Sequence, residues 1–329
     1  MSGVLTFACG RTDRTEAFFT GETVLEGGRL APLALPPPEI FPRALKRAEF
    51  DVTELSASSY LVHLSRGVSE YVALPVFLSR FFRFDSIYVR ADRGIDAPAD
   101  LRGKVVGTPE FQMTAGVWVR GILQEHFGLD HRSVRYVTGG LNLAGRKERI
   151  PLAPGPGQDI RPIDPAETLN ALLARGEIDA VVAPEPPACF LDGSAPVRRL
   201  FPDSRAAEQA YFAASGIFPI MHLVAVRRSL VDADPTLAGR LFKAFVLARD
   251  AGYRRLEAMA NAGSLPLMLP WLQVELANTR KALGHDHWPY GFEANRAAIE
   301  ALCRYSFDQS LSARAVAPEE LFDPRVLTT

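Results

Sequence analysis

Apolar and polar residues alternate along this 329-residue chain with two different periods. Short runs rich in valine, isoleucine, leucine and phenylalanine are typical of buried strands, whereas longer stretches repeat apolar residues at the spacing of an amphipathic helix. The two kinds of segment follow one another along the chain. This alternation predicts an α/β fold in which helices cover the faces of a sheet.

The strands expected from this pattern are Val4–Cys9, Phe50–Leu55, Val72–Phe77, Ser86–Val89, Lys104–Gly107, Ser133–Val137, Ala180–Ala183 and Leu223–Val226. The expected helices are Glu39–Ala48, Thr114–Phe127, Pro165–Arg175, Pro235–Glu257, Gln273–Leu283 and Phe292–Gln309. Proline and glycine break the pattern at Pro36–Pro38 and again between Pro151 and Pro165. We expect the second stretch to be a long surface loop, because neither residue type readily continues a helix or a strand ladder.

Composition narrows the class of protein. Hydrophobic residues make up 47% of the chain and charged residues 23%, as in an ordinary soluble globular protein. The net charge of −1 gives no broad attraction to nucleic acid or to an anionic membrane, so neither is expected as a partner. The longest apolar stretches, such as Leu265–Leu272, fall far short of the roughly 20 residues that a membrane helix requires.

The amino-terminal segment does not resemble a secretory signal. Val4–Cys9 is short, has no basic residue before it, and is followed at once by Arg11, Asp13 and Arg14. Met1-Ser2 has the character of a natural start. We therefore expect the chain to stay in the cytoplasm.

Cysteine and histidine spacing predicts no metal. Three widely spaced cysteines without a CxxC pair indicate buried thiols and not a zinc site or a disulfide framework. His285 and His287 stand two residues apart, but no acid follows at a ligand spacing. The chain also has no GxSxG elbow, no P-loop and no GxGxxG between a strand and a helix, which disfavours hydrolases, NTPases and dinucleotide enzymes.

Three motifs carry a resemblance to a known family. PEFQMTA (Pro109–Ala115), GIFPIMH (Gly216–His222) and WPYG (Trp288–Gly291) occur in the order and at the separations of the 4,5-dihydroxyphthalate decarboxylase family, which the chain resembles over nearly its whole length. The resemblance implies a homo-oligomer that decarboxylates a small hydroxylated aromatic carboxylate without a cofactor. The foremost candidate reaction converts 4,5-dihydroxyphthalate to 3,4-dihydroxybenzoate.

The same family resembles periplasmic solute-binding proteins of type II in fold. This implies two lobes with a ligand cleft between them. Lobe one is expected at residues 1–90 and again at 222–329, which include the carboxy-terminal helices. Lobe two, residues 91–221, is inserted between these parts.

Two helix starts are candidate carboxylate sites, because ligands of open α/β sheets bind at the carboxyl ends of strands. The segments Ser56–Tyr60 and Glu110–Thr114 each follow an expected strand and begin a helix, where backbone N–H groups lack intrahelical partners. One such site on each wall of a cleft suits a dicarboxylic acid. Alternatively, Ser56 and Thr114 only cap their helices. The substrate-binding candidates here are Ser56, Ser58, Tyr60, Gln112 and Thr114.

Arginines supply further candidates. Arg14 follows the first strand and can hold a carboxylate with its planar fork, although an ion pair with Asp13 is the alternative. One of Arg80 and Arg83 is expected to reach the cleft, and Arg80 is taken as the candidate.

Gly140 and Trp288 complete the expected site. Gly140 lies in a Gly-Gly pair after a strand and could let the backbone approach a ligand, although a simple turn explains it equally. Trp288 could stack on an aromatic ring, or pack the carboxy-terminal helices instead.

His222 is the first candidate for proton transfer. It closes the GIFPIMH motif at the predicted return to lobe one, and imidazole titrates near physiological pH. A core histidine is the alternative. The implied mechanism protonates the ring carbon that bears the carboxylate, and carbon dioxide then leaves. Glu110 or Asp13 is the expected counterpart of His222, with Arg14, Ser58 and Thr114 holding the carboxylate.

Two departures from the family pattern concern the substrate. Arg11-Thr12 precede Asp13-Arg14 where family members have a tyrosine, and Glu185 places an acid at the end of a strand, where it would repel a second carboxylate. Another hydroxybenzoate-type acid is therefore an alternative substrate. The alternative functions are a solute-binding protein for an aromatic or organic anion and a ligand-sensing module.

Overall fold

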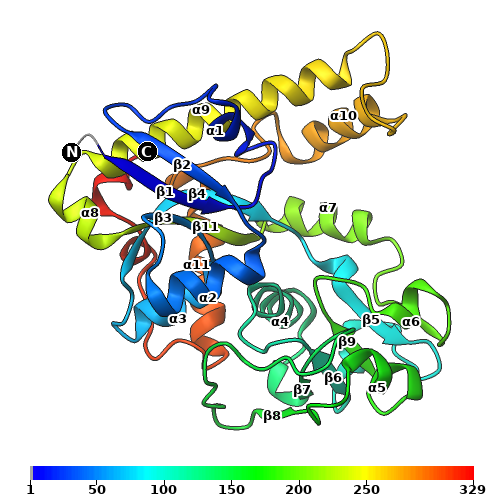
Figure 1. The fold of residues 1–329 in the computed structure, drawn as a ribbon. Helices are drawn as coiled ribbons and strands as arrows, with labels where there is room; N and C mark the ends of the chain where they lie inside the picture. The colour runs from blue at the N-terminus through cyan, green and yellow to red at the C-terminus, as the bar shows by residue number, and fades with distance from the viewer. Residues whose placement is uncertain (1–2) are drawn as a thin grey trace.

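Two sheets divide the strands between two lobes, as the computed structural model of residues 3–329 shows (Figure 1). Met1-Ser2, interpreted above as a natural start, lies outside the described residues. In the described part of the chain, five strands form the first sheet in the order β2-β1-β3-β11-β4, and six form the second in the order β10-β5-β9-β6-β7-β8. The predicted α/β class is confirmed.

The first sheet contains β1 (Val4–Cys9), β2 (Arg29–Ala34), β3 (Val52–Ser56), β4 (Tyr71–Arg80) and β11 (Ile220–Arg227). The second contains β5 (Ile87–Arg90), β6 (Val105–Thr108), β7 (Arg135–Thr138), β8 (Asp159–Pro162), β9 (Ala180–Val182) and β10 (Val197–Arg199). The helices are α1 (Glu16–Thr20), α2 (Pro37–Arg47), α3 (Ala57–Ser65), α4 (Thr114–Phe127), α5 (Leu169–Arg175), α6 (Ala188–Leu191), α7 (Ser204–Ser215), α8 (Arg228–Ala233), α9 (Leu237–Ala260), α10 (Leu272–Leu283) and α11 (Arg296–Asp308). The 3₁₀ turn η1 (Phe84–Ser86) precedes β5.

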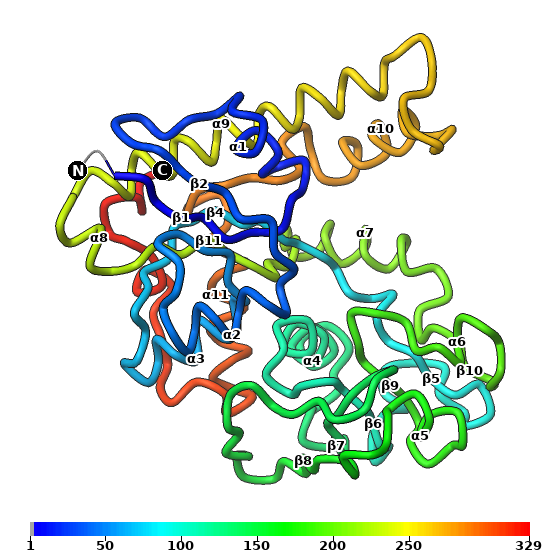
Figure 2. Tube along the Cα trace, in the orientation of Figure 1, coloured from blue at the N-terminus to red at the C-terminus, as the bar shows by residue number. Residues whose placement is uncertain are grey.

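The chain passes between the lobes twice (Figure 2). It leaves the first sheet at the end of β4 and returns from α7 into β11, and the amide of Phe81 donates to the carbonyl of Pro219 where the two crossings meet, at 3.1 Å. Along the chain, β1–β4 of the first sheet thus precede the strands of the second sheet, and β11 follows them. The lobe boundaries proposed from the family resemblance stay a prediction.

β11 runs antiparallel between β3, the central strand of the first sheet, and β4 at its edge. Its register places His222 opposite Ser56 and Val224 opposite Glu54. Since side chains alternate along a strand, His222 and Glu54 lie on the same face at diagonal positions. The fold therefore brings a residue from the last third of the chain beside one from the first fifth.

The expected surface loop 151–165 is only partly correct. Its last part forms β8, which pairs in parallel with β7 at the edge of the second sheet. β2 holds the corresponding edge of the first sheet and also contains a proline, Pro32. Proline is tolerated at an edge because a missing N–H there need not break a ladder bond.

Candidate active site

A cavity of about 300 Å³ opens between the lobes. Its walls come from the start of α2, the ends of β3 and β6, the start of α4, the return strand β11, and the loops after β4, β7 and β9. The lining residues are Pro37, Pro38, Phe41, Ser56, Arg83, Pro109, Met113, Thr114, Ala115, Leu141, Arg146, Arg149, Pro184, Glu185, Met221 and His222.

His222 lines this cavity and is held by Glu54. Its Nδ1 lies 2.6 Å from Oε1 of Glu54, a carboxylate that is only 5% exposed. The second oxygen of Glu54 accepts the Gly10 N–H at 2.9 Å, and the edge of Phe41 packs on the imidazole. An accepting carboxylate at Nδ1 leaves Nε2 as the nitrogen that can exchange a proton with a ligand.

The carboxylate of Glu54 is stable in its ionised form. Burial alone would raise its pKa, but the hydrogen bond and charge of His222, the Gly10 N–H and the charge of Arg14 together lower the pKa below its usual range. Glu54 is thus an anion that orients His222. The carboxylate that pairs with His222 is therefore Glu54, and the expectation that Glu110 or Asp13 fills this role is wrong.

Glu110 holds two arginines of the cavity wall instead. The carboxylate is 1% exposed, accepts from Arg146 Nη2 at 2.6 Å and from Arg149 Nε at 2.9 Å, and also accepts from Gln112 Nε2 at 2.8 Å. Burial opposes its ionisation, but the two guanidinium groups lower the pKa of Glu110 on balance. Because two cations share one anion, the pair of arginines keeps a net positive charge toward the cavity.

Arg83 contributes a third guanidinium to the cavity, so the prediction chose the wrong member of its pair. Its backbone adopts a left-handed conformation with φ at 72°, which costs a non-glycine residue about 1–2 kcal/mol. Arg80 is buried and donates to the carbonyls of Phe218 and Pro289, each at 2.8 Å, and to Asn295. Burial lowers its pKa to about 9. Arg80 therefore braces the crossing between the lobes.

The two expected carboxylate sites contact each other across the lobes. Ser56 Oγ lies 2.9 Å from Thr114 Oγ1, which also accepts the Ser58 N–H at 3.1 Å. Ser59 Oγ donates to Gln112 Oε1 at 2.9 Å close by. Ser56 and Thr114 do line the cavity, but their hydroxyls join the two helix starts instead of presenting separate anion sites on opposite walls.

Tyr60 and Gly140 do not reach the cleft. The Tyr60 hydroxyl is buried, donates to the Leu321 carbonyl at 2.6 Å and accepts the Ala73 N–H at 3.1 Å. A side chain at Gly140 would lie 1.7 Å from the carbonyl oxygen of Leu143, so tight chain packing accounts for this glycine.

Arg14 and Trp288 contact each other and do not line the cavity. Arg14 stacks 4.3 Å from the centre of the Trp288 ring and pairs with Asp13 at 2.6 Å, which is the alternative considered above. Trp288 Nε1 donates to the Phe77 carbonyl at 2.7 Å. Arg14 acts on the site through its charge on Glu54.

Sequence reasoning missed Glu54, Arg146 and Arg149. A signal existed for Glu54, because it is the one charged residue of β3. The arginines lie in an irregular segment between β7 and β8, where periodicity gives no orientation.

Two kinds of feature are absent from residues 3–329. No group of three or more histidine, cysteine, aspartate or glutamate side chains there is placed to hold a metal ion. No helix in the same range has the length and apolar character to cross a membrane.

Comparison with known proteins finds similarity over nearly the whole chain. It is 39% identical over 323 residues to a 4,5-dihydroxyphthalate decarboxylase of Comamonas testosteroni, covering 98% of this chain and 97% of that protein. It is 42% identical over 210 residues to a 4,5-dihydroxyphthalate decarboxylase of Pseudomonas putida, covering 64% and 81%. No protein-family model matches the chain.

Solved structures share the fold at low identity. The periplasmic aliphatic sulphonate binding protein SsuA of Escherichia coli aligns over all of both chains with a TM-score of 0.55 and 13% identity. The alkanesulfonate-binding protein SsuA of Xanthomonas axonopodis pv. citri, bound to MOPS, aligns over 98% and 97% with a TM-score of 0.51 and 16% identity. The predicted two-lobed fold of type II solute-binding proteins is confirmed.

Proposed function

The chain belongs to the 4,5-dihydroxyphthalate decarboxylase family, and we propose that it converts 4,5-dihydroxyphthalate to 3,4-dihydroxybenzoate. In balance, the reaction consumes one proton and releases one carbon dioxide. The observation that carries the proposal is the pair of His222 and Glu54 in a cavity with three guanidinium groups.

The cavity charge suits a dicarboxylate. The cavity lining contains three guanidinium groups, from Arg83, Arg146 and Arg149, and one acid, Glu185. Glu185 is exposed and follows Pro184, whose carbonyl accepts from Arg83. Guanidinium groups bind carboxylates in a bidentate way, so one carboxylate is held while the other stands near His222.

Proton transfer falls to His222. Its protonated Nε2 donates to the ring carbon that carries the departing carboxylate, the carbon–carboxylate bond breaks, and its electron pair restores the aromatic ring. Ionised Glu54 stabilises the imidazolium before transfer and keeps the ring oriented afterwards. A positioned acid of this kind contributes roughly 10²–10⁴-fold in rate.

The direct test mixes metal-stripped protein with 4,5-dihydroxyphthalate and follows carbon dioxide together with 3,4-dihydroxybenzoate. We expect turnover in the wild type and a loss of at least about 100-fold in His222→Asn. Binding without turnover would instead favour a solute-binding protein, and turnover of a related hydroxybenzoate alone would replace the substrate.

Two broader properties belong to the same proposal. A homo-oligomer is supported by exposed apolar residues between α9 and α10, a region treated in the Discussion. A cytoplasmic location stays a prediction from the amino-terminal sequence.

A further inference from the structure

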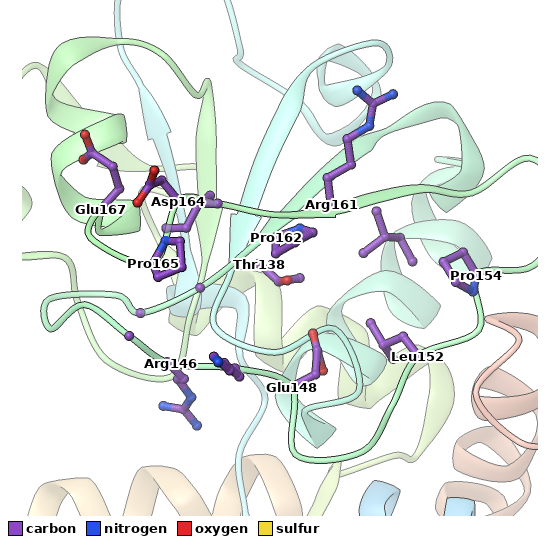
Figure 3. Close-up of a pocket in the computed structure, with 16 residues that line it drawn as sticks. Thr138, Arg146, Glu148, Leu152, Pro154, Arg161, Pro162, Asp164, Pro165 and Glu167 are labelled. Atoms are coloured by element: carbon purple, nitrogen blue, oxygen red, sulfur yellow. The ribbon is translucent and has the colours of Figure 1, made fainter.

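A second cavity of about 610 Å³ lies on lobe two, beside the cleft (Figure 3). It opens where β7 and β8 end, and Thr138 and Pro162, the last paired residues of the two strands, both line it. The carboxyl edge of parallel strands is the preferred place for ligands in open α/β sheets. Neither the proposed reaction nor the cleft uses this space.

Glu148 supplies an unsatisfied acceptor here. Its Oε1 accepts the Phe111 N–H at 2.6 Å, while Oε2 is buried and has no hydrogen-bond partner within residues 3–329. Burial, and after it the charge of Glu110, raise the pKa of Glu148 to about 7, although the N–H groups of Phe111 and Gln112 and the charge of Arg120 act against this. A buried acceptor without a donor is unfavourable, so a donor brought by a ligand would be stabilised there.

The remaining walls favour an uncharged ring. Leu152 and Ile160 present apolar surface. The lining has as many basic as acidic residues: the basic ones are Arg146, Lys147 and Arg161, and the acidic ones are Glu148, Asp164 and Glu167. The cleft, by contrast, carries an excess of positive charge.

The two cavities are physically linked. Arg146 lines both of them, and in Figure 3 its guanidinium is turned away from Thr138 and Glu148. Glu148 holds the amide of Phe111, and the neighbouring Glu110 holds Arg146 and Arg149. A ligand that contacts Glu148 therefore acts one residue away from the carboxylate that holds the arginines of the cleft.

We propose that this cavity is an effector site for a small uncharged phenol, whose hydroxyl donates to Glu148, and that its occupancy tightens anion binding in the cleft. The expected gain in affinity of the cleft for the substrate rests on the function proposed above.

Calorimetry on the full chain tests the site with catechol as ligand and phthalate, which has no hydroxyl groups, filling the cleft. We expect catechol to bind phthalate-saturated wild type, and to lower the Kd of phthalate about fivefold or more, the usual lower range of such coupling. Glu148→Gln keeps the bond to Phe111 but turns the free acceptor into an N–H donor, so catechol binding should weaken at least tenfold. Glu167→Gln, at an acid of the same cavity that pairs with Arg175, should bind catechol as wild type does.

Ile160→Trp provides a second variant, which reduces the volume of the cavity and leaves Glu148 unchanged. It should also lose catechol binding. No catechol binding to phthalate-saturated wild type, or catechol binding as tight as in the wild type by either Glu148→Gln or Ile160→Trp, would overturn the proposal. None of these readouts needs turnover, so a failure of the proposed reaction would leave them interpretable.

Discussion

His222 and Glu54 show how a strand register fixes chemistry at the scale of single residues. Their side chains share a face because His222 pairs with Ser56, two positions from Glu54. The GIFPIMH motif made His222 predictable. Its partner was not, because the pairing of β11 with β3 joins segments far apart in the sequence, and no local pattern encodes that register.

Replacing Glu54 by glutamine should lower kcat by roughly 10²-fold or more, since the imidazolium loses its buried counter-charge. Asp13→Asn is the matched control, because Asp13 is half exposed and pairs with Arg14. Steady-state kinetics on both variants would check this. Equal kcat for Glu54→Gln and the wild type would remove Glu54 from the mechanism.

At the scale of elements, sequence periodicity located the buried strands and long helices but missed three edge strands and the exposed helix α7. β2, β8 and β10 were missed, and all three are edge strands. β2 and β8 each contain a proline, which an edge strand tolerates. The helix α7 was missed as well. Among the residues of α7 only Tyr211 is buried, so its apolar stripe is weak.

α7 carries a titrating contact at the junction of the lobes. Burial first, and then the charge of Asp85, raise the pKa of Glu208 to about 7, although the Phe84 N–H and two arginines act against this. A raised pKa means that the folded state holds the proton more tightly, so its contribution to stability is present below about pH 4.5 and is lost as the pH rises through about 7.

Glu208→Gln should therefore gain stability over the wild type at pH 8 but not at pH 4.5. Denaturant midpoints of both proteins, measured across this range, would show the difference. A difference between the two proteins that does not change with pH would contradict the assignment. Glu300→Gln, a change on an exposed face of α11, serves as the control.

At the scale of the whole molecule, α9 and α10 form an arm that projects from lobe one (Figure 1). The connection between them exposes apolar side chains, with Leu265 66% exposed and Trp271 68% exposed. Contiguous exposed apolar residues indicate a contact surface. The same surface on a second copy offers a self-complementary contact. The two-lobed architecture itself was predictable from the three motifs, whereas the projecting arm was not.

The double variant Leu265→Glu and Met268→Glu should dissociate the oligomer, because it places four charges in a two-fold contact. Leu191→Glu is a matched control on lobe two, since Leu191 is 69% exposed. Light scattering after gel filtration would report the masses. An unchanged mass of the double variant would exclude the arm as the interface.

The position of β11 between β3 and β4 also sets the order in which the molecule can be completed on the ribosome. Residues 87–199 supply every strand of the second sheet without interruption, so lobe two can close while synthesis continues. The first sheet must leave a vacancy between β3 and β4 until residues 220–227 emerge, roughly ten seconds or more later at ordinary elongation rates. Because His222 arrives on that strand, a truncated nascent chain holds no complete site, and catalytic competence appears only after lobe one has closed around β11.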